Sequence, residues 1–177
     1  LGIFLCCEPG FGLTARMNPR HLIAMVCVTV AVSVSAQNSG PAPMRTENGV
    51  AWFDARELGV EGRGWTNPLS FYDRLPATAK GKVRAPVWDL SRHSAGMCVR
   101  FVTDATTIHA RWALHNPWLS MANMTAIGVS GLDLYVRTES GDWRWLGVGQ
   151  PTAQTNTVKL TENLIPGKRE YLLYLPL

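Results

Sequence analysis

Short stretches in which apolar and polar residues alternate recur about every ten residues from Gly49 to Leu177, with turn residues between them. The clearest stretch is Leu132–Arg137, where Leu132, Leu134 and Val136 share one face and three polar or amphipathic residues share the other. Roughly seven or eight such stretches, without a convincing helix among them, predict an all-β fold. We expect an antiparallel β-sandwich that resembles a jelly roll.

Turn residues predict how some of these strands are connected. Residues 97–103 and 107–114 flank a short polar turn and are expected to form a hairpin, and so are residues 132–138 and 143–148. Residues 83–90 are also expected to form a strand. That strand should lie at a sheet edge, because the proline within it lacks the N–H donor that a central strand needs.

The first part of the chain carries the pattern of a secretory signal peptide. A basic start at residues 17–21 precedes an apolar run at residues 22–32, and Val34-Ser35-Ala36 supplies the small residues of a cleavage site. The run is about 11 residues long, short of the roughly 20 that a membrane-spanning helix requires. A buried core helix is the alternative, which the β-branched residues disfavour. We expect a signal-peptide helix, export to the periplasm or the exterior, and no stable membrane span after cleavage.

These features divide the chain into four segments. Residues 1–16 precede the first methionine and show no coherent periodicity, so they are interpreted as upstream sequence or a misplaced start. Residues 17–36 are the predicted signal peptide, and residues 37–48 form a polar linker marked by prolines. Residues 49–177 are the predicted β-sandwich domain.

Charge and ligand patterns argue against several classes of function. The formal net charge is +4, and the basic residues are scattered, which argues against a nucleic-acid partner. His93, His109 and His115 have no cysteine or carboxylate partners at metal-ligand spacing. No phosphate-binding glycine loop is present. We therefore expect neither a metal site nor a cofactor.

The pentapeptide Gly131-Leu132-Asp133-Leu134-Tyr135 resembles the motif that names the GxDLY domain. This domain is the β-sandwich module in front of the catalytic domain in a group of SGNH (GDSL-like) hydrolases. Four more stretches match the family pattern in order and spacing: residues 72–76, 87–96, 121–125 and 171–177. The resemblance implies that the chain is a fragment, and that an SGNH catalytic domain is the partner that follows its last strand.

The residues that SGNH catalysis needs are not found in the sequence. Such an enzyme uses a Gly-Asp-Ser block for its nucleophile and a late Asp-x-x-His for its base. Here Gly141-Asp142-Trp143 has tryptophan in place of serine, and the spacing from Asp89 to His93 is one residue too long. We therefore expect no catalytic residue in this segment. The resemblance implies that the parent is a serine carboxylic-ester hydrolase, and we take a carbohydrate deacetylase as the hypothesis.

Two groups of residues are candidates for contact with a partner. The motif and the polar matched blocks supply candidates for a domain interface: Arg74, Ser91, Arg92, His93, Ser94, Gly131, Asp133 and Tyr135. Each also has a purely structural interpretation, in which hydroxyl, guanidinium and carboxylate groups satisfy their neighbours within the fold. One such hypothesis pairs Asp133 with Arg74.

The second group consists of tryptophans that are candidates for stacking on sugar rings, namely Trp118, Trp143 and Trp145. They support an alternative function, a free-standing carbohydrate-binding β-sandwich with a polysaccharide partner. A structural cell-surface domain without a ligand is a third interpretation. The sequence does not reveal the substrate, the source or the oligomeric state.

Overall fold

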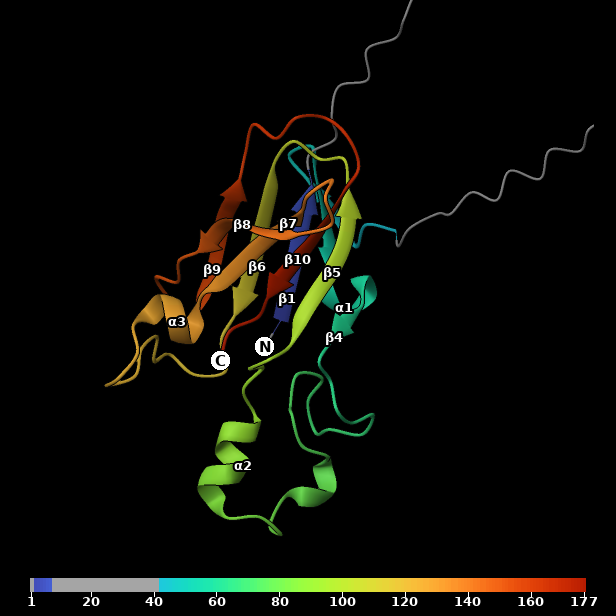
Figure 1. Cartoon of the computed structure of the whole chain (residues 1–177). Coiled ribbons are helices and arrows are strands. Elements are labelled where there is room, and N and C mark those ends of the chain that lie inside the picture. Colours follow the sequence, from blue (N-terminus) through green and yellow to red (C-terminus); the bar gives the residue numbers. More distant parts are fainter. Residues whose placement is uncertain (1, 8–41) are drawn as a thin grey trace, which may run out of the picture.

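The computed structural model describes residues 2–7 and 42–177, which form two antiparallel β-sheets packed face to face (Figure 1). The first sheet has the order β2-β3-β1-β6-β9, and its strands are β1 (Gly2–Cys7), β2 (Arg45–Glu47), β3 (Val50–Asp54), β6 (Ile108–Ala113) and β9 (Thr155–Thr161). The second has the order β4-β5-β10-β7-β8, and its strands are β4 (Val60–Glu61), β5 (Cys98–Thr103), β7 (Leu132–Arg137), β8 (Trp143–Gly149) and β10 (Arg169–Tyr174). The predicted antiparallel sandwich is confirmed.

The core lies between the sheets and consists of the apolar residues of the alternating stretches. Trp112 on β6, Leu134 on β7, and Tyr171 and Leu173 on β10 are all fully buried. Their neighbours along each strand point to the opposite face, as the pleat of a strand requires. The alternation in the sequence therefore identified the inward face of these strands correctly.

Of the two predicted hairpins, one is confirmed and one is wrong. β7 and β8 pair across the turn at residues 138–142, with a bulge after Leu134. β5 and β6 lie in different sheets, so the connection at residues 104–107 crosses from one layer to the other. Each of these two strands has one apolar face, and this pattern fits a partner in either sheet.

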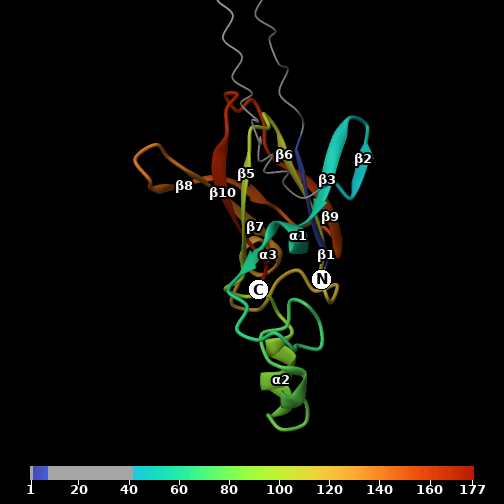
Figure 2. The ribbon, with the colours of Figure 1, turned by 90° about the vertical axis from the view of Figure 1, so that its right-hand side faces the viewer.

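The predicted strand at residues 83–90 is wrong, because this segment contains the helix α2 (Ala85–Ser91). Pro86 lies in its first turn, where the N–H that proline lacks would have no partner within the helix. The other helices are short: α1 (Ala55–Leu58), α3 (Ala126–Ser130) and the 3-10 turn η1 (Ala77–Ala79). Figure 2 shows the segment with α2 projecting from one end of the sandwich.

β1 is the unexpected element of the fold. It lies inside the first sheet, with β3 on one side and β6 on the other, although no periodicity predicted a strand at residues 2–7. The predicted signal peptide and residues 37–41 of the linker lie outside the described residues, and the origin proposed for residues 1–16 stays a prediction. The rest of the predicted linker is described, and it contains the short strand β2. Among residues 2–7 and 42–177, no helix has the length and apolar character needed to cross a bilayer.

Candidate functional site

The motif strand β7 begins at a residue that has no room for a side chain. A Cβ on Gly131 would lie 2.4 Å from the carbonyl oxygen of Ile127 and 3.1 Å from that of Gly149. The backbone N–H of Gly131 donates to the same Ile127 carbonyl, at 3.0 Å, and closes α3. Glycine is therefore needed here for close backbone packing, which sets the direction of β7 after the helix.

The polar residues of the motif face outward on the second sheet. The Asp133 carboxylate accepts a hydrogen bond from the indole Nε1 of Trp145, at 3.2 Å. Tyr135 packs edge to face against Tyr174, with ring centroids 5.7 Å apart. Asp133 and Tyr135 therefore belong to one exposed aromatic surface, which also includes Trp145 and Tyr174.

The hypothesis that Asp133 pairs with Arg74 is wrong. The guanidinium of Arg74 donates to the carbonyl oxygens of His93 and Leu90, at 3.1 and 2.6 Å. Arg74 therefore holds the loop after α2, whereas Asp133 holds a tryptophan of β8. Both residues have polar partners within the fold, as their structural interpretation predicted.

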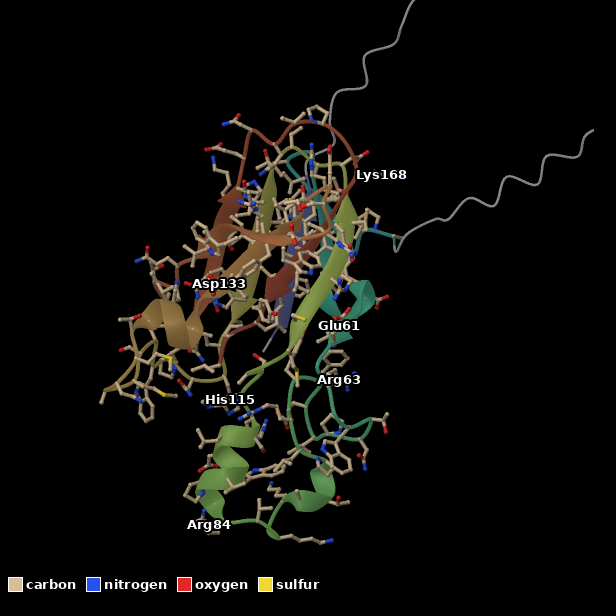
Figure 3. The ribbon with its side chains drawn as sticks, viewed as in Figure 1. Glu61, Arg63, Arg84, His115, Asp133 and Lys168 are labelled. Carbon is tan, nitrogen blue, oxygen red and sulfur yellow. The ribbon has the colours of Figure 1, made fainter. Side chains whose placement is uncertain are left out.

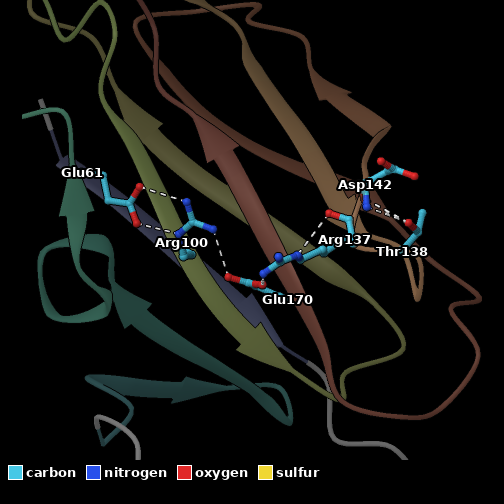
Figure 4. A network of polar contacts seen from close by, with 7 residues as sticks. Glu61, Arg100, Arg137, Thr138, Asp142 and Glu170 are labelled. Atoms are coloured by element: carbon cyan, nitrogen blue, oxygen red, sulfur yellow. Dashed lines mark hydrogen bonds and ion pairs between the residues drawn. The ribbon is translucent and has the colours of Figure 1, made fainter.

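A chain of ion pairs crosses the same outer face (Figure 4). Arg100 pairs with Glu61 and Glu170, and Arg137 pairs with Glu170 on its other side. Hydrogen bonds from Arg137 and Arg100 hold the pKa of the Glu170 carboxyl below its usual range. The Arg100 and Arg137 guanidinium carbons lie 5.3 and 5.9 Å from the ring centroid of Trp143, so charged neighbours flank this half-buried indole.

The polar stretch Ser91–Ser94, which comprises the last residue of α2 and the loop after it, is joined to the last residues of the given sequence. The Ser94 hydroxyl is buried and donates to the carbonyl oxygen of Pro176, at 2.6 Å. The Ser91 hydroxyl donates to the carbonyl of Trp88, which stabilises the end of α2. Arg92 pairs with the buried Asp73, with Nε 2.9 Å from Oδ1. The loop is therefore held in a fixed shape beside residues 176 and 177.

A hollow of about 470 Å³ lies at this end of the molecule, and we call it the end hollow. Its lining includes His93 and Ser94 from the loop after α2, His115 and Trp118 from the loop after β6, and Leu177. Figure 3 shows His115 between the sandwich and the segment with α2. The backbone N–H of Leu177 donates to the carbonyl of Val129, at 2.9 Å, so the last residue forms part of the wall.

The end hollow contains serine, histidine and aspartate, but they are not arranged for nucleophilic catalysis. A nucleophile needs its base within hydrogen-bond reach, and the base needs an orienting partner. Among the described serine and histidine residues that line the hollow, no hydroxyl is hydrogen bonded to an imidazole. Ser94 donates to a backbone carbonyl instead, and Asp89 is exposed. Residues 2–7 and 42–177 also contain no group of three histidine, cysteine or acidic side chains placed to hold a metal.

His93 makes the stability of this site depend on pH. Burial lowers the pKa of its imidazole below the usual 6.5, and the charges of Arg74 and His115 act in the same direction. The His93 imidazole is therefore protonated near pH 6.5 in the unfolded chain but only at a lower pH in the folded chain. The free energy of unfolding should fall as the pH is lowered through 6.5. We expect the free energy of unfolding from urea titrations to decrease between pH 7 and pH 5.

The His93→Gln variant should lose part of this decrease, because glutamine does not titrate. The carboxyl groups of Glu61 and Glu170 also have lowered pKa values, but their contribution is lost only below about pH 4.5. A decrease between pH 7 and pH 5 that is identical in the parent sequence and in His93→Gln would contradict this assignment.

Sequence reasoning missed the polar partners of two candidate residues, Arg92 and Asp133. Asp73 and Arg92 are 19 positions apart and meet only because the segment with α2 folds back on the segment before it. Trp145 reaches Asp133 across the β7–β8 pair. The confirmed hairpin prediction was the one signal that pointed to this second contact.

The fold and the site together define a β-sandwich whose polar loop is hydrogen bonded to its last residues, and in which residues 2–7 and 42–177 assemble no serine–histidine–carboxylate set. Residues 50–177 match the family model described as GxDLY, the N-terminus of SGNH hydrolase-type esterases, and the chain belongs to this family. A crystal structure of a GDSL-like lipase from Bacteroides ovatus is similar, with 31% sequence identity and a TM-score of 0.64. The match covers 69% of this chain and 35% of that one, and no curated protein matches.

Proposed function

We propose that this chain is a non-catalytic accessory module of an exported SGNH-type esterase, whose catalytic serine, histidine and aspartate lie beyond Leu177. One observation carries the proposal: the loop at residues 91–94 is hydrogen bonded to the last residues of the module through Ser94 and Pro176. A domain that continues from Leu177 would meet this loop first. The family match, which describes an N-terminus of such esterases, supports the same order of domains.

The module would then form one wall of the cleft through which substrate reaches the catalytic domain. The end hollow is lined in part by Leu177, where a following domain would leave the sandwich, and we call this place the chain exit. Trp118 also lines the hollow, and 78% of its surface is accessible. An aromatic ring in that position suits the flat faces of sugar rings. We therefore propose that the parent removes acyl groups, such as acetyl groups, from a polysaccharide in the periplasm or outside the cell.

The alternative is a carbohydrate-binding module that acts through the outer face of its second sheet. The observation that favours it is the aromatic surface of Tyr135, Trp145 and Tyr174, where Trp145 is 58% exposed and Asp133 fixes its indole. In this case binding would not need the end hollow or the catalytic domain.

Two matched variants of the complete esterase distinguish these functions, since both remove one exposed tryptophan. We expect Trp118→Ala to raise KM for acetylated xylan about two- to tenfold, equivalent to the roughly 0.5–1.5 kcal/mol of one aromatic contact. Its kcat on p-nitrophenyl acetate should be unchanged, because the ring acts on binding of the polymer. Trp145→Ala should leave both values unchanged. An increase in KM for Trp145→Ala alone would support the alternative, and no change in either variant would contradict both.

A further inference from the structure

β1 occupies a position inside the first sheet that we call the strand slot, the space between β3 and β6. Its residues pair in antiparallel register on both sides, so that Leu5 lies opposite Phe53 of β3 and Ala110 of β6. Ile3, Leu5 and Cys6 of β1 are each buried to 99% or more. Without an occupant, the facing edges of β3 and β6 would lack backbone partners and the core would open.

The strand that fills the slot here, β1, lies outside the residues that match the family model. The residues that match the family model, 50–177, include β3 and β6 but not the strand between them. β1 also precedes the predicted signal peptide at residues 17–36, so cleavage at that site would remove it. The part of the chain that matches the family model therefore contains a slot for one strand that a segment outside residues 50–177 must supply.

We propose that in the exported esterase the strand slot is filled by a strand from the polypeptide that follows Leu177, so that the two domains share one sheet. This inference rests on the proposed function, because it needs a catalytic domain after Leu177. It goes beyond that function by assigning an acceptor site and the chemistry of its ligand. The ligand is an extended segment with apolar side chains at alternate positions, like Ile3 and Leu5 of β1.

The position of the chain exit supports this occupant. Gly2 at the start of β1 pairs with Ala113, and the next residue along, Leu114, lines the end hollow together with Leu177. Figures 1 and 2 both show the beginning of β1 and the C-terminus at the same end of the sandwich. A polypeptide that leaves Leu177 therefore starts near the open end of the slot, and it can enter in the direction in which β1 runs.

The strand direction also fits the edges of the slot. β1 is antiparallel to both β3 and β6, so an incoming strand with the direction of β1 makes two antiparallel ladders. A strand from a second copy of the module would need the same direction, but its covalent attachment would not place its start beside Leu177 of this copy. That occupant is an outcome of the test below.

The test uses the complete esterase purified from residue 37 onward, with the photo-crosslinking residue p-benzoylphenylalanine in place of Arg111. Arg111 lies on β6 directly opposite Phe4, which places the probe beside the slot. We expect cross-links to peptides from beyond Leu177, located by mass spectrometry. The same probe in the 177-residue chain should cross-link to residues 2–7. The control position is Thr157, an exposed residue of β9, which pairs with β6 on the side away from the slot. A probe at Thr157 should give no cross-link to the downstream segment.

Each other outcome contradicts the proposal. A cross-link between two copies would assign the slot to a partner chain. Rapid hydrogen exchange at the slot-facing amides of β3 and β6, without a cross-link, would show an empty slot, and failure of the esterase to fold from residue 37 would show that β1 is indispensable. Esterase activity, measured on the same sample, tests the proposed function separately: an inactive protein with downstream cross-links would overturn that function and leave the acceptor slot standing.

Discussion

Replacing Trp112 with alanine is expected to lower the free energy of unfolding by about 3–5 kcal/mol, the usual cost of removing a large aromatic side chain from a core. Trp112 is completely buried near the C-terminal end of β6, and its indole Nε1 donates to the carbonyl oxygen of Ser130, at 2.9 Å. The ring also fills the space that opens at Gly149, where an added Cβ would lie 3.1 Å from it. One side chain therefore joins the first sheet to the start of the motif strand.

Two further variants separate the packing of Trp112 from its hydrogen bond. Trp112→Phe keeps most of the apolar volume and loses the donor to Ser130, so we expect a smaller loss of about 1–2 kcal/mol. Trp118→Ala is the exposed control and should change stability by less than about 0.5 kcal/mol. Urea unfolding followed by circular dichroism measures all three. A loss below about 1 kcal/mol for Trp112→Ala would contradict the position given to this residue in the core.

Replacing Asp73 with asparagine is expected to cost about 2–3 kcal/mol, because it leaves Arg92 without its charged partner. The Asp73 side chain is 2% exposed and that of Arg92 is 22% exposed, so solvent compensates the arginine only in part. The other oxygen of Asp73 accepts from the backbone N–H of Ser70, at 3.0 Å. The pair therefore fixes the segment with α2 against the segment before it, at the wall of the end hollow.

Asp142→Asn provides the matched control for Asp73, since Asp142 lies in the exposed β7–β8 turn. We expect it to change stability by less than about 0.5 kcal/mol. The double variant Asp73→Leu with Arg92→Met should lose less than Asp73→Asn alone, because no charge is left without a partner. Equal stabilities of Asp73→Asn and Asp142→Asn would rule out a stabilising ion pair at this place.

The sequence was sufficient for the fold class because the period of two in strands such as β7 and β10 is a direct consequence of the pleat. It also predicted which residues of those strands face the core. It failed at residues 83–90, where a short apolar stretch with a proline fits an edge strand as well as the first turn of a helix. It failed again at β5 and β6, because alternation says that a strand has a buried face and does not say in which sheet.

Long-range partners were beyond the sequence for a different reason. Gly2–Cys7 is almost continuously apolar, and such a run fits a strand buried on both faces, a helix or a targeting segment equally well. Only the pairing with β3 and β6 identifies it as a strand. The Asp73–Arg92 pair and the contact between Ser94 and Pro176 likewise depend on how distant segments come together. For the candidate site, the sequence supplied the loop at residues 91–94 but not its contact with the chain exit.

The central proposal is that this polypeptide is the accessory module of an esterase and does not itself contain the catalytic groups. Hydrolysis of p-nitrophenyl acetate by the purified 177-residue chain, compared with a buffer blank and with the polypeptide extended past Leu177, tests it most directly. We predict a rate equal to the blank for the 177-residue chain and clear turnover for the extended polypeptide. Turnover by the 177-residue chain itself, abolished by Ser94→Ala or Ser130→Ala, would place the catalytic serine in the end hollow and contradict the account.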